Sequence, residues 1–251
     1  MTGCATTEEL QNTTAMNTTI PAISIQGLIL AFVPAIIVIG IMLRWRANAK
    51  TAIYATFRML VQLLLIGYVL IYIFETDHFA VILAVLLVML VVSSWIAVRP
   101  VHGGKRHSYL HALAAISVGG VLTLALVTQF VIGVEPWFSP RYVVPLAGMI
   151  FAGSMNAVSL GAERFQAESD RGVDYLQARR IAFQAALIPI INSLFAVGVV
   201  ALPGMMTGQI LSGVSPLIAA EYQIVVMTML FGASGVSAAV YLRLQRGQQT
   251  G

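Results

Sequence analysis

Residues Ala80–Val92 read AVILAVLLVMLVV, and no polar side chain interrupts them. A membrane β-strand alternates between apolar and polar residues, so this run predicts an α-helix instead. The surrounding stretch Phe79–Val98 has the roughly 20 residues that a helix needs to cross a hydrocarbon core about 30 Å thick. We therefore expect a transmembrane helix at this place in the chain.

The composition of the whole chain agrees with a membrane location. Of the 251 residues, 59% are hydrophobic and only 10% are charged, whereas soluble domains carry about 25% charged residues. So few polar residues would not cover a surface that faces water. We expect an all-α integral membrane protein with about seven transmembrane helices in one domain, residues 20–242. Their expected bounds are Ile20–Leu43, Tyr54–Phe74, Phe79–Val98, His111–Gly133, Tyr142–Leu160, Ala185–Leu202 and Leu217–Leu242.

The charges between these helices predict the orientation of the chain. Twelve of the 14 Lys and Arg residues follow the first, third, fifth or seventh helix, and Arg141 is the only one on the opposite side. Because short basic loops stay in the cytoplasm, we expect the N-terminus outside and the C-terminus inside. The polar tail 1–19 would then be external and the tail 243–251 cytoplasmic. No block of Lys and Arg suggests binding to nucleic acid.

Residues 161–183 form the longest polar stretch inside the chain. Apolar side chains such as Phe165 and Leu176 recur in it at roughly helical spacing, which is typical of an amphipathic helix at a membrane face. We interpret it as a short cytoplasmic coupling-type helix, with a solvated connector as the alternative. Candidate docking residues for a soluble partner are Asp170, Arg171, Asp174, Tyr175, Leu176, Arg179 and Arg180.

A second interruption, Leu202–Gly213, reads LPGMMTGQILSG. Its glycines and proline disfavour helix, yet Met, Ile and Leu keep it apolar. Broken backbone at membrane depth persists only where it is buried in protein or lines a cavity. We expect a re-entrant or kinked segment near the outer face, after the sixth helix. A tight external loop is the alternative.

Polar residues inside membrane helices are costly and often functional. Gln62, Asn156 and Asn192 should lie deepest and face the interior of the bundle, whereas Arg58 could reach back to the cytoplasmic surface. Met205 and Met206 could offer thioethers to a soft metal, although packing is the simpler role because adjacent helical residues do not share a face. The candidate substrate path consists of Arg58, Gln62, Asn156, Asn192, Met205, Met206, Gln209, Glu221 and Gln223.

No motif for nucleotide hydrolysis or covalent catalysis is present. Gly103-Gly104-Lys105-Arg106 contains a Gly-Lys pair, but it lacks the earlier glycine and the following Ser or Thr of a phosphate-binding loop. We therefore expect no enzyme activity and no cofactor in this chain. His107 and His111 lie four residues apart, a spacing that could place two imidazoles on one helix face for a metal, with two solvated histidines as the simpler alternative.

Small residues recur four apart at Gly153, Ala157 and Gly161. Residues at that spacing lie on one helix face and let a second helix approach closely. We expect packing within the chain, with a subunit interface as the alternative.

The second half of the chain carries longer motifs. One pattern is formed by residues 144–150 (VPLAGMI), 156–160 (NAVSL), 185–189 (AALIP), 197–213 (VGVVALPGMMTGQILSG), 215–217 (SPL) and 222–224 (YQI). In the first half of the chain, residues 58–63 (RMLVQL) and 67–70 (GYVL) belong to the same pattern. Over roughly residues 54–242 this pattern resembles the Fet-type iron export permeases. Plant aluminium-tolerance membrane proteins are relatives in that family.

The resemblance implies a multi-pass permease subunit of an ATP-binding-cassette transporter in a bacterial cytoplasmic (inner) membrane. It implies a permease homodimer, separate ATPase subunits that bind the ATP, and export of a metal ion such as iron. The chain departs from the family where Val173–Arg180 replaces a longer segment with a Leu-Gly-Ala coupling motif. An ATP-independent metal carrier or channel, or a membrane scaffold that transports nothing, would fit the same residues.

Overall fold

The computed structural model of the protein describes residues 23–75, 78–101 and 105–248. The predicted external tail 1–19 lies outside them. The described chain is all-helical, and its only β-type pairing is an isolated bridge between Val197 and Ala201. It divides into two compact units, residues 1–70 and 71–251, and each is described by itself.

The first unit contains α2 (Ile25–Leu30), α3 (Val33–Arg44) and most of α4 (Ala49–Glu75). The Ser24 hydroxyl caps α2 by accepting a hydrogen bond of 3.1 Å from the Gly27 amide. A proline in the first turn of α3 starts a new helix segment there, since proline tolerates that position. No residue of α2 or α3 is buried, as expected of helices that are apolar all round and surrounded by lipid.

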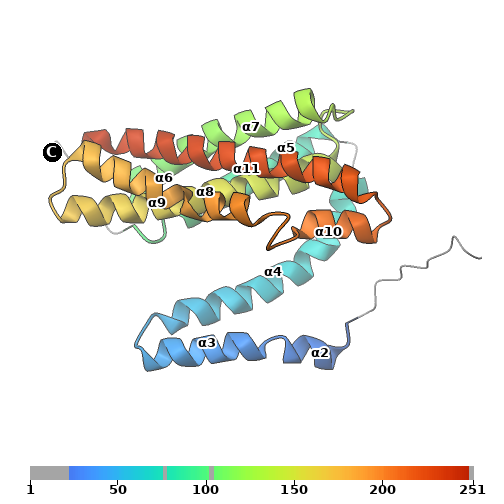
Figure 1. Cartoon of the computed structure of the whole chain (residues 1–251), viewed down its shortest axis with the longest axis horizontal. Helices are drawn as coiled ribbons and strands as arrows, with labels where there is room; N and C mark the ends of the chain where they lie inside the picture. The colour runs from blue at the N-terminus through green and yellow to red at the C-terminus, as the bar shows by residue number, and fades with distance from the viewer. Residues whose placement is uncertain (1–22, 76–77, 102–104, 249–251) are drawn as a thin grey trace, which may run out of the picture. The chain divides into compact units, whose positions relative to one another are not determined.

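The second unit is a helical bundle. Its helices are α5 (Phe79–Ala97), α6 (Lys105–Ile116), α7 (Leu122–Ala125), α8 (Pro140–Asp170), α9 (Tyr175–Ala196), α10 (Gly204–Leu211) and α11 (Pro216–Leu244). One π-helical turn, Ser117–Val121, connects α6 to α7, and a second, Leu126–Val131, continues α7. A 3₁₀ turn follows α11 at Gln245–Gln248. Figure 1 shows α8, α9 and α11 running side by side, and α8 also packs against α5.

Small side chains bring the three central helices together. Ala157, Ala186 and Ala238 form a buried cluster with Phe183 packed against it. A Cβ atom added at Gly161 would lie 3.4 Å from the Cβ atom of Ala186, so α8 and α9 are in close contact there. The small residues of α8 therefore serve packing within the chain, as the first of the two sequence-based alternatives proposed.

Six helical spans in the described part of the chain are long and apolar enough to cross a membrane. They are Ile25–Arg44, Ala49–Glu75, Phe79–Ala97, Arg106–Val131, Pro140–Asp170 and Pro216–Leu244. The all-helical membrane class is thus confirmed, whereas the count of seven is not. The orientation of the chain stays a prediction.

The sixth predicted helix, Ala185–Leu202, has wrong bounds. The observed helix α9 begins at Tyr175 and ends at Ala196, so it includes polar residues that the prediction had placed in a separate amphipathic helix. Gly198 adopts a φ of +82°, and the turn it forms with its neighbours stops the helix before Leu202. This helix is not among the six spans because charged residues occupy its first turns.

The polar stretch 161–183 is not a separate amphipathic helix, contrary to the prediction. α8 continues to Asp170, α9 begins at Tyr175, and only a short turn separates them. α8 continues because Ala162 and Phe165 extend its buried face. The chain breaks between Val197 and Pro203, earlier than the predicted interruption Leu202–Gly213, and most of that predicted segment folds as the short helix α10.

Candidate functional site

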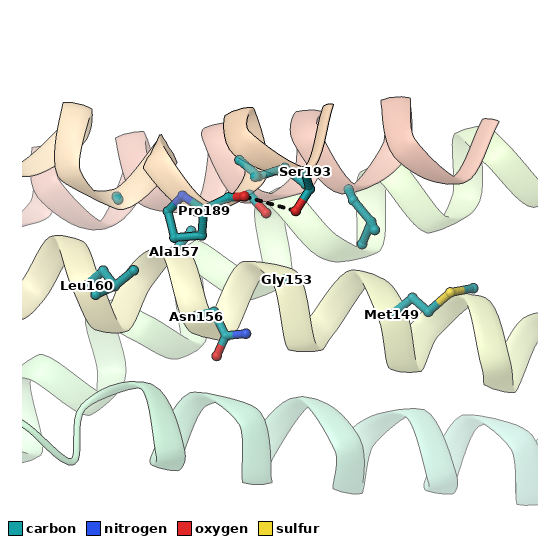
Figure 2. A pocket seen from close by; sticks show the side chains of 11 residues that line it. Met149, Gly153, Asn156, Ala157, Leu160, Pro189 and Ser193 are labelled. Carbon is teal, nitrogen blue, oxygen red and sulfur yellow. Dashed lines mark hydrogen bonds between the residues drawn. The ribbon is translucent and has the colours of Figure 1, made fainter. Parts of the chain in front are cut away.

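A cavity of about 270 Å³ lies between α8, α9 and α11. Asn156 on α8 borders it, with Ser193 on α9 and Ser234 on α11. Figure 2 shows Met149, Gly153, Asn156 and Leu160 along α8, with Pro189 and Ser193 on α9. The Ser193 hydroxyl donates a hydrogen bond of 3.0 Å to the Pro189 carbonyl. The cavity wall is therefore mostly apolar, with a few polar groups at its edge.

A second cavity, also about 270 Å³, adjoins the first. Met149 of α8 borders both, so the two cavities follow one another along this helix. Met205 and Gln209 of α10 close the second cavity, and Tyr222 of α11 completes the wall. The Gln209 side-chain oxygen Oε1 is buried and accepts no hydrogen bond from the described residues. A buried amide oxygen without a donor is free to bind a cation or a water molecule.

A third cavity of about 350 Å³ lies between the C-terminal end of α9, α10 and α11. Met206, Met227 and Gln223 line it. Gln223 is only 5% exposed, and no donor in the described chain reaches its Oε1 atom. The neighbours Met205 and Met206 thus face two different cavities, as expected for adjacent residues of a helix.

Contrary to the prediction, Gln62, Asn156 and Asn192 are exposed and do not lie in the interior of the bundle. Asn192 and Glu221 are exposed and border none of the three cavities. Asn192 precedes Ser193 by one residue, and the rotation of about 100° between neighbouring helical residues turns it away from α8. In the first unit, Gln62 is exposed and Arg58 half-buried.

The two histidines form no metal site in the described part of the chain. His107 and His111 are neighbours on α6, with ring centroids 6.1 Å apart in an edge-to-face arrangement. Over the described residues, no group of three or more His, Cys, Asp or Glu side chains comes together as a metal site would require. The interaction that the structure shows between these two histidines is the contact of their imidazole rings.

At the end of the bundle away from α10, the turn between α8 and α9 carries some of the predicted docking residues. Its buried carboxylate, Glu168, is 5% exposed and pairs with Arg164 at 2.7 Å and with Arg171 at 3.2 Å. The sequence analysis had not singled out Glu168. Its spacing of four and three residues from the two arginines was a signal for these ion pairs.

Two further contacts fix this turn. The Asp174 carboxylate caps α9 by accepting hydrogen bonds from the amides of Leu176 and Gln177 at 3.0 and 3.2 Å. The Tyr175 hydroxyl donates a hydrogen bond of 3.0 Å to the Leu242 carbonyl near the end of α11. The exposed docking candidates Asp170 and Arg171 therefore stand on a turn that is held to the central helices.

The other docking candidates lie beside the turn rather than on it. Leu176, Arg179 and Arg180 line a groove between α9 and α11, and Arg243 of α11 lies on the same groove. The Arg179 guanidinium carbon lies 5.4 Å from the centroid of the Tyr175 ring. The seven predicted residues thus separate into an exposed turn and a basic groove.

Comparisons with known proteins agree with this architecture. The family model described as "Uncharacterised protein family (UPF0014)" matches residues 25–248. The "Probable iron export permease protein FetB" of Escherichia coli is 32% identical over 84% of this chain and 87% of its own length. The "UPF0014 membrane protein STAR2" of rice is 38% identical over 74% of this chain and 69% of its own.

The "Protein ALUMINUM SENSITIVE 3" of Arabidopsis thaliana is 31% identical over 81% of this chain and 80% of its own length. No solved structure matches the chain. The family match spans both units and includes the residues that line the three cavities and the turn. The chain therefore belongs to the UPF0014 family of membrane proteins.

Proposed function

We propose that this chain is the permease subunit of an ATP-binding-cassette transporter that exports a metal ion such as iron. The name of the Escherichia coli relative supports iron as the ion. The observation that carries the proposal is the pair of cavities that share Met149 along α8. Adjoining cavities inside a membrane bundle are what a transported ion would pass through.

The groups that border this path suit a transported cation. Asn156 and Gln209 offer amide oxygens, and Met149 and Met205 offer thioether sulfurs. All of these ligands are neutral, so they hold a cation less tightly than carboxylates would. Transport requires sites that bind an ion firmly enough for entry and weakly enough for release. Met206 and Gln223 would form a side branch of the path in the third cavity.

The turn between α8 and α9 is the proposed contact for a separate ATPase, which would bind the ATP. Asp170 and Arg171 are exposed at its tip. The ion pairs of Glu168 and the bond from Tyr175 to α11 tie the turn to the helices that border the first cavity. A push on the turn would therefore reach α8, α9 and α11, the three helices that border the first cavity.

The first test is transport by the full-length protein in lipid vesicles, with and without a co-expressed ATP-binding-cassette ATPase. We expect ferrous iron to move only when both the ATPase and ATP are present. Gln209→Leu should reduce this transport without changing co-purification of the ATPase, because it removes one ligand inside the path. Thr207→Val on the exposed side of α10 is the matched control. Transport by the chain alone, driven by a gradient, would overturn the ATPase partnership.

The second test addresses the docking turn. Asp170→Lys reverses a charge at the exposed tip, and Glu163→Lys makes the same change two helical turns earlier on α8, where Glu163 is also exposed. We expect Asp170→Lys to weaken co-purification with the ATPase and Glu163→Lys to leave it unchanged. Equal behaviour of the two variants would place the ATPase contact elsewhere.

A further inference from the structure

A groove of about 480 Å³ lies between α9 and α11, beside the docking turn. Its walls combine two kinds of residue. Arg179 and Arg180 come from the first turns of α9, and Arg243 comes from the end of α11. Phe183, Ala239 and Leu242 supply an apolar surface next to these arginines.

Among the described residues, the three arginines form no ion pair with an acidic side chain. The two ion pairs of the described residues both involve Glu168, and no acidic residue lines the groove. Arg180 and Arg243 are exposed, and the Arg179 guanidinium lies over the ring of Tyr175. Three guanidinium groups on one groove therefore create a positive site that a bound anion would neutralise.

The position of the groove along the helices indicates the chemistry of that anion. α11 is long and apolar enough to cross the membrane, and Arg243 lies one residue before its end. A charged residue at the end of a membrane span lies at the level of the lipid headgroups. The apolar residues Phe183 and Ala239 come four residues deeper on each helix than Arg179 and Arg243, respectively. The groove thus offers cations at headgroup depth and apolar contacts at the depth of acyl chains.

We propose that this groove binds one anionic phospholipid, with its phosphate on Arg179, Arg180 and Arg243 and an acyl chain along Phe183 and Ala239. Guanidinium groups match phosphate oxygens because their N–H donors form paired hydrogen bonds. Basic pockets between membrane helices are a known mode of headgroup recognition. The bound lipid joins the start of α9 to the end of α11 and so supports the docking turn. The site does not depend on the identity of the transported ion.

The test is native mass spectrometry of the full-length protein released from bilayers of phosphatidylcholine with a minor fraction of phosphatidylglycerol. We expect the wild-type protein to retain phosphatidylglycerol in preference to phosphatidylcholine. Arg180→Gln combined with Arg243→Gln should weaken this retention by about 30-fold, the effect of two basic residues near a membrane surface. The double Lys variant, which keeps both charges, should retain most of the lipid.

Arg246→Gln is the matched control, since it removes one exposed charge from the same end of the bundle but not from the groove. Retention that falls equally in Arg246→Gln would show general attraction to the surface and overturn the site. A wild-type protein without preference for phosphatidylglycerol would overturn it too, and this measurement needs no variant to fold. Unchanged lipid retention in the double Gln variant, together with loss of the ATPase, would make the groove a protein-docking surface instead.

Discussion

The α8–α9 turn and the α10 end of the second unit differ in how their polar side chains are partnered. At the α8–α9 turn, Glu168, Asp174 and Tyr175 all have partners within 3.2 Å. At the α10 end, the buried amide oxygens of Gln209 and Gln223 have none among the described residues. Satisfied polar groups hold a structure rigid, whereas unsatisfied ones cost stability and are retained where they bind something. The difference supports the proposal that the turn contacts the ATPase and that the α10 end contacts the ion.

The largest stability effect is expected at the turn. Arg164→Ala combined with Arg171→Ala leaves the buried Glu168 carboxylate without a partner, and a broken buried ion pair costs about 3–5 kcal/mol. Thermal unfolding of the purified protein in detergent measures this loss. Adding Glu168→Gln to the double variant should restore part of the stability, because a neutral amide is easier to bury. A triple variant no more stable than the double would show that packing, not charge, causes the loss.

A smaller loss is expected in the middle of the bundle, between the two ends. A Cβ atom at Gly119 would overlap the Ser237 hydroxyl of α11 and lie 3.0 Å from the Ala233 carbonyl oxygen. Gly119→Ala should therefore destabilise the protein by about 1–3 kcal/mol through overpacking. Gly232→Ala on α11 is the control, since no atom lies within 4 Å of its added Cβ. Equal effects of the two variants would show that the close approach of Gly119 to α11 does not affect the free energy of unfolding.

The helix cap at the turn is expected to contribute less. Asp174→Ala removes the acceptor of two amide hydrogen bonds, and loss of such a cap costs about 1 kcal/mol. Unfolding in detergent again gives the change. Asp174→Asn keeps an acceptor at the same place and should behave almost like the wild type. An Asn variant as unstable as the Ala variant would contradict the capping role.

The smallest stability change, and the sharpest contrast with the turn, is expected at Gln223. Gln223→Met removes an amide whose oxygen has no partner, so the protein should be equally stable or more stable by about 1 kcal/mol. Iron transport in vesicles should nevertheless fall, because the third cavity loses its polar ligand. Gln184→Met, at an exposed position of α9, is the control for both measurements. Lower stability of Gln223→Met would show that this amide supports the fold.

The sequence by itself determined that the chain is a helical membrane protein. Apolar runs such as Ala80–Val92 allow only a helix in lipid, because each backbone polar group must find its partner within the segment. The motif around Pro203–Met206 also identified the family correctly. The length of a run does not show how far a helix continues, however. α8 and α9 extend into polar sequence because Phe165 and Ala178 still have buried positions to fill.

Only the tertiary structure decided which polar residues line the cavities. Asn156 and Asn192 look alike in sequence and both are exposed, yet only Asn156 of the two borders the first cavity. The rotation of each helix about its axis decides between them, and packing against neighbouring helices sets that rotation. The two residues Arg180 and Arg243 likewise line one groove because α9 packs against α11. Composition and apolar length fix what crosses the membrane, whereas side-chain contacts between helices fix what each polar group can bind.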